Sequence, residues 1–192
     1  MKYAHYDKET GKLLGYYDDA IHQTIPKPNI QILEKQWQEA VDNGYNYVDA
    51  ENKILSYKDF RTLDEIKRQK LASLKAKFEI KLSKSTIHSQ TINKDIDAGT
   101  VALTNINGLL DILENDDDTV EFRLADNSFT TVTRTQLVEM KKEIIQVGQQ
   151  LYKNKWAIEE QINNETDIEK LKNSVIDLDN GMLVYTEPKG EE

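Results

Sequence analysis

Apolar and polar positions alternate near the start of the chain and predict a β-hairpin. Two Tyr-rich runs, KYAHYD and KLLGYYD, flank the segment KETGK, whose Gly11 favours a turn. Further along, Pro26 and Pro28 hold the backbone extended, because each also restricts the residue before it. A second hairpin is predicted around DAEN in the run YNYVDAENKILSY.

A short helix is predicted between these two hairpins, over residues 33–42. Ile32, Trp37 and Ala40 recur at near-helical spacing, and Asn43-Gly44 supplies a left-handed stop. This helix carries Trp37 inward. Residues 1–60 are therefore predicted to form a small, aromatic-rich module that contains β-structure.

The pattern changes to a helical period after a linker over residues 58–62. Thr62 and Glu65 have the spacing of a capping box, in which each side chain binds a backbone N–H at the start of a helix. A long helix is predicted from there. Its apolar stripe consists of Ile66, Leu71, Leu74, Phe78 and Leu82. The polar run SKSTIHSQTIN then favours a short strand or hairpin, and AGTVALTNINGLLDILEN favours a second helix that ends at the acidic run ENDDD.

Two strands and the start of a third helix are predicted over residues 120–136. Val120, Phe122 and Leu124 alternate with polar residues, and a second alternating run begins at Phe129. Residues 125–128 connect the two strands. Thr133 and Gln136 form another capping box, which opens the next helix.

The strongest helical signal covers residues 137–162. Its apolar positions keep a spacing of three and four over more than three heptads. They are Leu137, Met140, Ile144, Val147, Leu151, Ile158 and Ile162. We expect this stripe to pack on the helix of residues 66–82 in the same chain, and self-association along it would make the protein a homo-oligomer.

The chain is predicted to end in a short helix and a loose strand. Thr166 and Glu169 have capping-box spacing before DIEKLKNSV, and MLVYTEPKGEE reads as a strand with a charged tail. The predicted fold class is α+β. A β-rich module of residues 1–60 precedes a mainly helical domain, residues 61–192, which carries an inserted β-hairpin.

Charge and composition narrow the range of partners. The formal net charge is −9, so an acidic surface repels both nucleic acid and anionic membranes. Apolar runs such as GLLDIL are far shorter than the roughly 20 residues that a membrane span needs. The chain has no cysteine, which leaves no disulfide, Cys-ligated zinc site or thiol nucleophile and makes the cytoplasm the default location.

The candidate chemical motifs favour structural interpretations. Asp126-Asn127 has the residue types of a turn, because Asp and Asn side chains bind their own backbone two residues on. His5, His22 and His88 show no zinc-ligand spacing. The acidic segments 116–118 and 177–181 lack the ligand offsets of a calcium loop, and no phosphate-loop or hydrolase motif occurs. We therefore expect no catalytic residues, metal or cofactor.

Aromatic density is the unusual feature of the first 60 residues. Seven of the nine Tyr and one of the two Trp lie there. A small core would explain them, and so would a binding face, because Tyr and Trp anchor protein interfaces. The candidate partner-binding residues are Tyr6, Tyr16, Tyr17 and Trp37. Alternation along a strand places Tyr16 and Tyr17 on opposite faces, so one is predicted to pack inward.

Two segments resemble phage protein families. YAHYDKETGKLLGYYDDAIHQTIPKPNIQILEKQWQEAV is similar to the N-terminal portion of phage tail-fibre assembly proteins, which have a Tyr-rich hairpin, an IP segment and the helix pattern I-x-x-x-x-W-x-x-A. Ile25-Pro26, Ile32, Trp37 and Ala40 match it. The C-terminal half resembles a domain of unknown function common in phage tail-region proteins. The matching residues are Phe122, Arg123, Ala125, Asp126, Asn127, Phe129, Ala157, Ile158, Thr166, Glu169 and Leu171.

These resemblances imply a phage tail role without catalysis. The preferred function is that of a tail-fibre assembly chaperone or cap that binds the fibre protein, or another tail protein, in the cytoplasm of the bacterial host. A permanent structural component of the tail, such as a connector or tip subunit retained in the virion, is the alternative. A tail-associated hydrolase is a more distant one, since it needs two carboxylates roughly 5–10 Å apart and no pair is nominated by the sequence.

Overall fold

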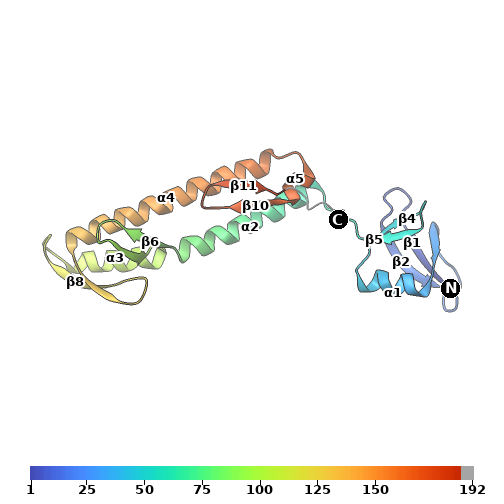
Figure 1. Cartoon of the computed structure of the whole chain (residues 1–192), viewed down its shortest axis with the longest axis horizontal. Helices are drawn as coiled ribbons and strands as arrows, with labels where there is room; N and C mark the ends of the chain where they lie inside the picture. The colour runs from blue at the N-terminus through green and yellow to red at the C-terminus, as the bar shows by residue number, and fades with distance from the viewer. Residues whose placement is uncertain (187–192) are drawn as a thin grey trace. The chain divides into compact units, whose positions relative to one another are not determined.

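The computed structural model describes residues 1–186, and it confirms the α+β class (Figure 1). The chain divides into two compact units, Met1–Phe60 and Arg61–Glu192. The predicted charged tail after residue 186 lies outside the described residues. Each unit has its own apolar core, so the two are described separately.

The first unit is a three-stranded antiparallel sheet with one helix and one small hairpin. The sheet has the order β2-β1-β3, and both predicted hairpins and the helix are confirmed. Its elements are β1 (Lys2–Tyr6), β2 (Leu13–Asp18), β3 (Asn29–Ile32), α1 (Glu34–Asp42), β4 (Tyr47–Asp49) and β5 (Ile54–Ser56).

Strand β3 was not predicted, because Pro26 and Pro28 obscure the strand pattern that follows them. Proline cannot donate a ladder hydrogen bond but is tolerated just before an edge strand. Ile30 lies opposite Ala4 of β1 in the antiparallel register. The core of this unit consists of Ala4, Ile30, Ile32 and Val48, with Tyr6, Leu13, Tyr16, Trp37 and Leu55 packed around it.

The second unit is built on two long helices that pack side by side. They are α2 (Leu63–Ser83) and α4 (Arg134–Asn164), and each begins at a predicted capping box, with Thr62 accepting from Glu65 N and Thr133 from Gln136 N. The predicted packing of their apolar stripes is confirmed. One core cluster joins Ile66, Leu74, Phe78, Leu151, Ile158 and Ile162.

Helix α3 (Thr100–Ile112) and two hairpins cover the N-terminal half of α4. The hairpins are β6 (Thr86–Ser89) with β7 (Lys94–Asp97), and β8 (Thr119–Arg123) with β9 (Phe129–Thr133). A second core cluster fills the space between them and contains Ile96, Ile106, Phe122, Val132, Leu137 and Met140.

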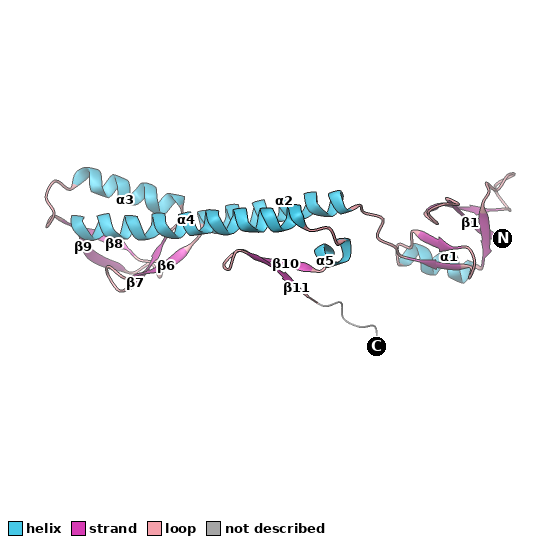
Figure 2. Ribbon diagram, turned by 90° about the horizontal axis from the view of Figure 1, so that it is seen from above, coloured by secondary structure: helices cyan, strands magenta, loops and turns pink. Residues whose placement is uncertain are grey.

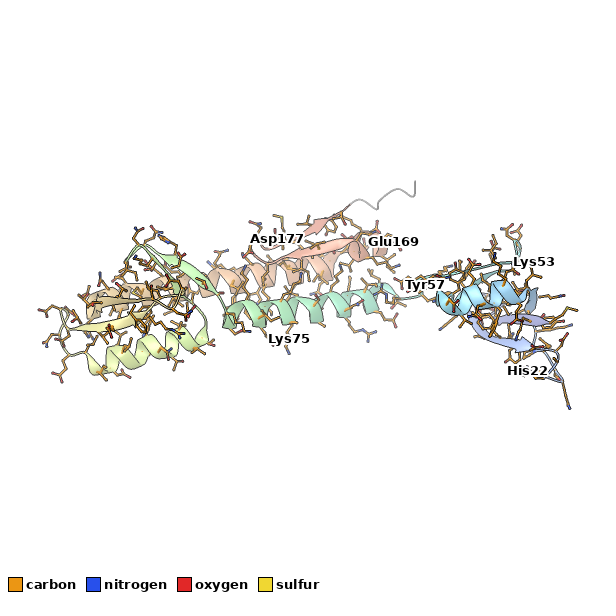
Figure 3. All side chains as sticks on the ribbon, turned by 60° about the horizontal axis from the view of Figure 1, so that its bottom comes forward. His22, Lys53, Tyr57, Lys75, Glu169 and Asp177 are labelled. Carbon is orange, nitrogen blue, oxygen red and sulfur yellow. The ribbon has the colours of Figure 1, made fainter. Side chains whose placement is uncertain are left out.

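A third hairpin lies on one side of the α2–α4 pair, as Figure 2 shows. It joins β10 (Ser174–Asp177) to β11 (Met182–Tyr185), after the short helix α5 (Ile168–Lys172). Ile176, Leu178 and Leu183 face the helices. In Figure 3, Asp177 on this hairpin and Lys75 on α2 lie on opposite sides of the helical layer. The prediction of a single inserted hairpin in this unit is therefore wrong, since its described residues contain three hairpins.

Three of the five hairpin loops found in residues 1–186 share one construction. An aspartate at the first position accepts hydrogen bonds from the backbone N–H groups two and three residues later, and the fifth residue has a positive φ. These loops begin at Asp7, Asp49 and Asp177. Their fifth residues, Gly11, Lys53 and Gly181, have φ of 72°, 56° and 67°. The pattern D-x-x-N/T followed by Gly or Lys thus marks a hairpin in this chain.

Two details of the helical predictions are wrong. Val147 was placed in the buried stripe of α4, but its side chain is 41% exposed, because the stripe drifts around a straight helix when it is held at seven-residue spacing. The short helix α5 is capped by Asp167, which accepts from the backbone N–H groups of Glu169 and Lys170. Thr166 is not the cap, because Asp167 is the residue in the extended conformation at the helix start.

Candidate partner-binding surfaces

The sheet of the first unit has two faces of different character. On one face Ala4 and Tyr16 lie opposite each other and point into the core. On the other face Tyr3 lies opposite Tyr17, and His5 follows two positions after Tyr3 along β1. Because side chains alternate along a strand, Tyr3, His5 and Tyr17 form one continuous row.

Three of the four predicted anchors lie on the core face. Tyr6, Tyr16 and Trp37 are partly buried against the core cluster. The ammonium of Lys2 lies 4.3 Å from the centroid of the Trp37 ring, a cation–π contact that covers the outer side of the indole. Burial raises the pKa of the Tyr16 phenol. These rings account for the small core that a module of this size needs.

Tyr17 is the predicted anchor on the opposite face. Its ring meets those of His5 and His22 edge-on, with centroids 6.1 and 5.2 Å away. His22, in the loop after β2, is labelled on the outside of the first unit in Figure 3. We call Tyr3, His5, Tyr17 and His22 the aromatic face. The placement of Tyr16 inward and Tyr17 on the other side agrees with the predicted alternation.

Sequence reasoning missed Tyr3, His5 and His22 as members of this face. The signal for two of them was present, because Tyr3 and His5 alternate with the core residue Ala4 along β1. The sequence held no such signal for His22, because the loop after β2 brings this residue to Tyr17. In that loop, His22 N donates to Asp18 O at 2.8 Å.

The edges of this sheet also matter for partner binding. Within the described residues, β3 pairs with β1 on one side and with no strand on the other. An unpaired edge presents backbone donors and acceptors that another strand can use. Strand β3 lies next to β1, which carries Tyr3 and His5 of the aromatic face, and its free edge offers a second kind of contact.

The Asp126-Asn127 segment is a turn. Asp126 Oδ1 accepts hydrogen bonds from Ser128 N at 2.9 Å and Ser128 Oγ at 2.6 Å, and Asn127 has a φ of 68°. The Ser128 hydroxyl and backbone N–H hold the pKa of Asp126 below its ordinary value. The carboxylate is thus ionised, exposed and occupied by its own loop, which confirms the structural interpretation.

His88 and Glu143 of the second unit also form hydrogen bonds with neighbouring protein groups. His88 Nδ1 lies 2.8 Å from Asp95 Oδ1 and its Nε2 lies 3.1 Å from Asn93 Oδ1, so both ring nitrogens have partners within their own hairpin. Burial opposes ionisation of Glu143, but hydrogen bonds from the β6–β7 loop hold its pKa below the ordinary value. Among residues 1–186, no group of three or more His, Asp or Glu side chains is placed to hold a metal ion.

A groove of about 390 Å³ lies between α3 and β8 in the second unit. Ala102, Leu109 and Phe122 supply its apolar lining, and Asp97 and Arg123 its charged one. All the residues that line it come from the second unit. In the same described part of the chain, no helix combines the length and apolar character that a membrane crossing requires.

Comparison with known proteins identifies one family. No curated protein and no solved structure matches the chain. Residues 65–176, more than half of the chain, match the family described as domain of unknown function DUF4376. The match runs from α2 into β10 and lies within the second unit, so it agrees in outline with the resemblance found in the C-terminal half. This protein belongs to the DUF4376 family.

Proposed function

We propose that this protein is a phage tail-fibre assembly chaperone or cap, which binds the fibre chain in the host cytoplasm through its first unit. The proposal rests on the resemblance of the N-terminal segment to tail-fibre assembly proteins. The observation that carries it is a sheet that combines the aromatic face with the unpaired edge of β3.

The two features of the first unit suit a β-rich partner. Fibre chains expose strand edges until they trimerise, and such edges aggregate unless another chain covers them. The four-residue edge of β3 supplies main-chain pairing for one extended segment. Tyr3 of β1 and Tyr17 of β2 supply flat rings on one face of the same sheet, and rings of this kind dominate the binding energy of many interfaces.

The four anchors predicted from sequence have different roles in this proposal. Tyr17 contacts the partner. Tyr6, Tyr16 and Trp37 hold the sheet in shape from the core face. No enzymatic step, metal or cofactor is part of the proposal.

The test is coexpression of a fibre gene with full-length protein. A Tyr3→Ala/Tyr17→Ala variant is expected to lose co-purification with the fibre and to lower the yield of soluble trimer. Tyr57→Ala is the matched control, because Tyr57 is 65% exposed and lies outside the aromatic face. A shortened chain that begins at Asp59 should behave as the double variant does. Full chaperone activity of that shortened chain would move the binding surface to the second unit.

A resident tail subunit is the second candidate function, and the length of α4 favours it. A helix of 31 residues spans about 46 Å, a rigid spacer of the kind a connector uses. Mass spectrometry of purified particles separates the two functions. A chaperone is absent from the virion, whereas a connector or tip subunit is present in fixed copy number.

A further inference from the structure

Helix α4 carries a second stripe of residues beside the one that it buries. The spacing within this stripe is four, three, four, three and four residues, which keeps its members on one line along the helix. We call it the outer stripe. Its members are Val138, Lys142, Ile145, Gln149, Tyr152 and Trp156. A helix with two such lines is typical of bundles in which it has neighbours on two sides.

Within residues 61–186, α2 reaches the outer stripe at Tyr152, through Phe78, and the other large apolar members of the stripe, Ile145 and Trp156, stay exposed. The core clusters place α2 and α3 against the other stripe of α4, and the hairpins pack beside Glu143, Asn154 and Gln161. In Figure 1, α4 forms the upper border of this unit. Trp156 is accordingly 58% exposed, and Ile145 and Tyr152 are exposed with it.

The aromatic part of the outer stripe is held in place before any partner arrives. The Tyr152 ring meets Phe78 of α2 edge-on at 4.8 Å and lies 5.9 Å from the Trp156 ring. A ring fixed in this way loses little conformational freedom on binding. Tyr152 and Trp156 are therefore suited to anchor an interface.

The charges that flank the outer stripe indicate what covers it. Lys141 and Lys142 lie near its N-terminal end, with Glu139 and Glu143 on either side, and Glu159 and Glu160 lie just past its C-terminal end, after Lys153 and Lys155. The net charge of −9 opposes association of two copies in general, so local complementarity has to supply the attraction. An antiparallel pair of α4 helices supplies it, because Lys141 and Lys142 of each copy can then lie beside Glu160 and Glu159 of the other.

One antiparallel register satisfies charge and shape together. With the twofold axis between Gln150 and Leu151, Ile145 lies opposite Trp156 of the second copy, and Gln149 lies opposite Tyr152. The same register sets Lys142 opposite Glu159. A shift by one heptad places Ile145 against the polar Asn163. A parallel pair places Lys142 against Lys142, and like charges at such positions are unfavourable.

We propose that a second copy of this chain docks on the outer stripe, with its α4 antiparallel and in this register, to form a twofold dimer. The isologous contact follows from the symmetry, since one patch meets the same patch. Lys142 and Glu159 have partners on their own helix, Glu139 and Lys155, at 2.7 and 2.6 Å. Partly exposed pairs of this kind exchange at small cost. The dimer does not depend on the fibre-binding function.

Sedimentation of the full-length protein over a range of concentrations tests the interface. Wild type is expected to form a dimer, and Trp156→Glu should weaken the dimer about tenfold or more. Ile80→Glu is the matched control, because Ile80 is 64% exposed on α2 and lies outside the stripe. Circular dichroism checks that both variants fold. A monomer at every concentration, or a dimer that Trp156→Glu leaves intact, would overturn the proposal.

Charge reversal tests the register. Lys141→Glu with Lys142→Glu should weaken the dimer, and adding Glu159→Lys and Glu160→Lys to the same chain should restore it. Failure of the fourfold variant to recover would contradict the pairing.

Cysteine cross-linking tests the orientation against a clean background, since the chain has no cysteine. Under oxidation, a mixture of Ile145→Cys and Trp156→Cys chains should cross-link as a heterodimer. Ile145→Cys alone should not, because 11 helical residues separate the two sites by about 16 Å. Self-linking of Ile145→Cys, or no link in the mixture, would reject the antiparallel register.

Discussion

The side-chain amide of Gln161 on α4 occupies the place of a neighbouring strand beside Leu183 of β11. Its Oε1 accepts from Leu183 N at 2.8 Å, and its Nε2 donates to Gly181 O at 3.0 Å. On the opposite edge of the hairpin, Lys70 of α2 donates to Ser174 O of β10, and Lys77 donates to Ile176 O at 3.5 Å. Both edges of an isolated two-stranded hairpin are therefore bound by helix side chains, which supplies the support that such a hairpin lacks on its own.

Replacing Gln161 tests this attachment. Gln161→Ala leaves Leu183 N and Gly181 O without a partner at a partly buried site, and we expect a loss of about 1–3 kcal/mol in the free energy of unfolding. Gln146→Ala, at an exposed position of the same helix, should stay within about 0.5 kcal/mol of wild type. Urea denaturation measures both. Equal stability of the two variants would show that the edge contact contributes nothing.

Two positions of the predicted α4 stripe should respond differently to truncation. Leu151 is 7% exposed in the α2–α4 core, so Leu151→Ala should cost about 2–5 kcal/mol in unfolding free energy. Val147→Ala, at a position that the structure turns toward solvent, should cost less than about 1 kcal/mol. Both variants shorten an apolar side chain of α4 to alanine, so their losses can be compared directly. A larger loss at Val147 than at Leu151 would contradict the packing described above.

The β8–β9 turn should depend on the carboxylate of Asp126. Asp126→Ala removes the acceptor for both Ser128 hydrogen bonds, so the thermal midpoint should fall. Asn127→Gly should leave the midpoint unchanged or raise it, because glycine adopts the positive φ of that position without strain. Calorimetry of the two single variants measures both thermal midpoints. A rise with Asp126→Ala would mean that the carboxylate strains the turn.

The C-terminal end of α4 should lose stability in acid through Glu165. Backbone N–H donation, first from Asp167, together with Lys170, lowers the pKa of Glu165 from 4.5 to about 2. Its ionised form therefore stabilises the fold. That contribution is complete above pH 4.5 and is lost as the pH falls toward about 2.

Glu165→Gln tests this pH dependence. The variant should be less stable than wild type at pH 7, and the difference should shrink as the solution is acidified over that window. Glu114→Gln, at an exposed glutamate of the same unit, is the control. Thermal midpoints measured in steps from pH 7 to pH 3 follow the effect. If the difference in midpoint between variant and wild type stays constant from pH 7 to pH 3, the variant loses stability through altered geometry and not through the missing charge.

Features that depend on neighbouring residues could be predicted from the sequence. The caps at Thr62 and Thr133 and the turn at Asp126 each bind backbone within three residues, so local pattern is sufficient. The prediction named Thr166 as the cap of α5, whereas the cap in the structure is Asp167. Errors of one residue are usual at a helix start, because two adjacent residues can both accept hydrogen bonds there.

Features set by distant contacts could not be predicted. Strand β10 reads as the end of a helix, but it pairs with β11, and its outer edge is bound by Lys70, 104 positions earlier. One local signal for the β10–β11 hairpin was present, because the loop that begins at Asp177 has the same construction as the loop that begins at Asp7. The aromatic face required the register of β1 and β2, which places Tyr3 opposite Tyr17. No local pattern fixes that register before the strands pair.

The β10–β11 hairpin also determines the order in which the second unit can be completed during synthesis. Helix α2 leaves the ribosome about a hundred residues before the strand that covers it. Until β10 and β11 have emerged, the paired helices lack Ile176 and Leu183 on one side of their core. A nascent chain that stalls just before them would therefore expose that apolar surface to chaperones and proteases, so the synthesis of β10 and β11 is the step that closes this unit.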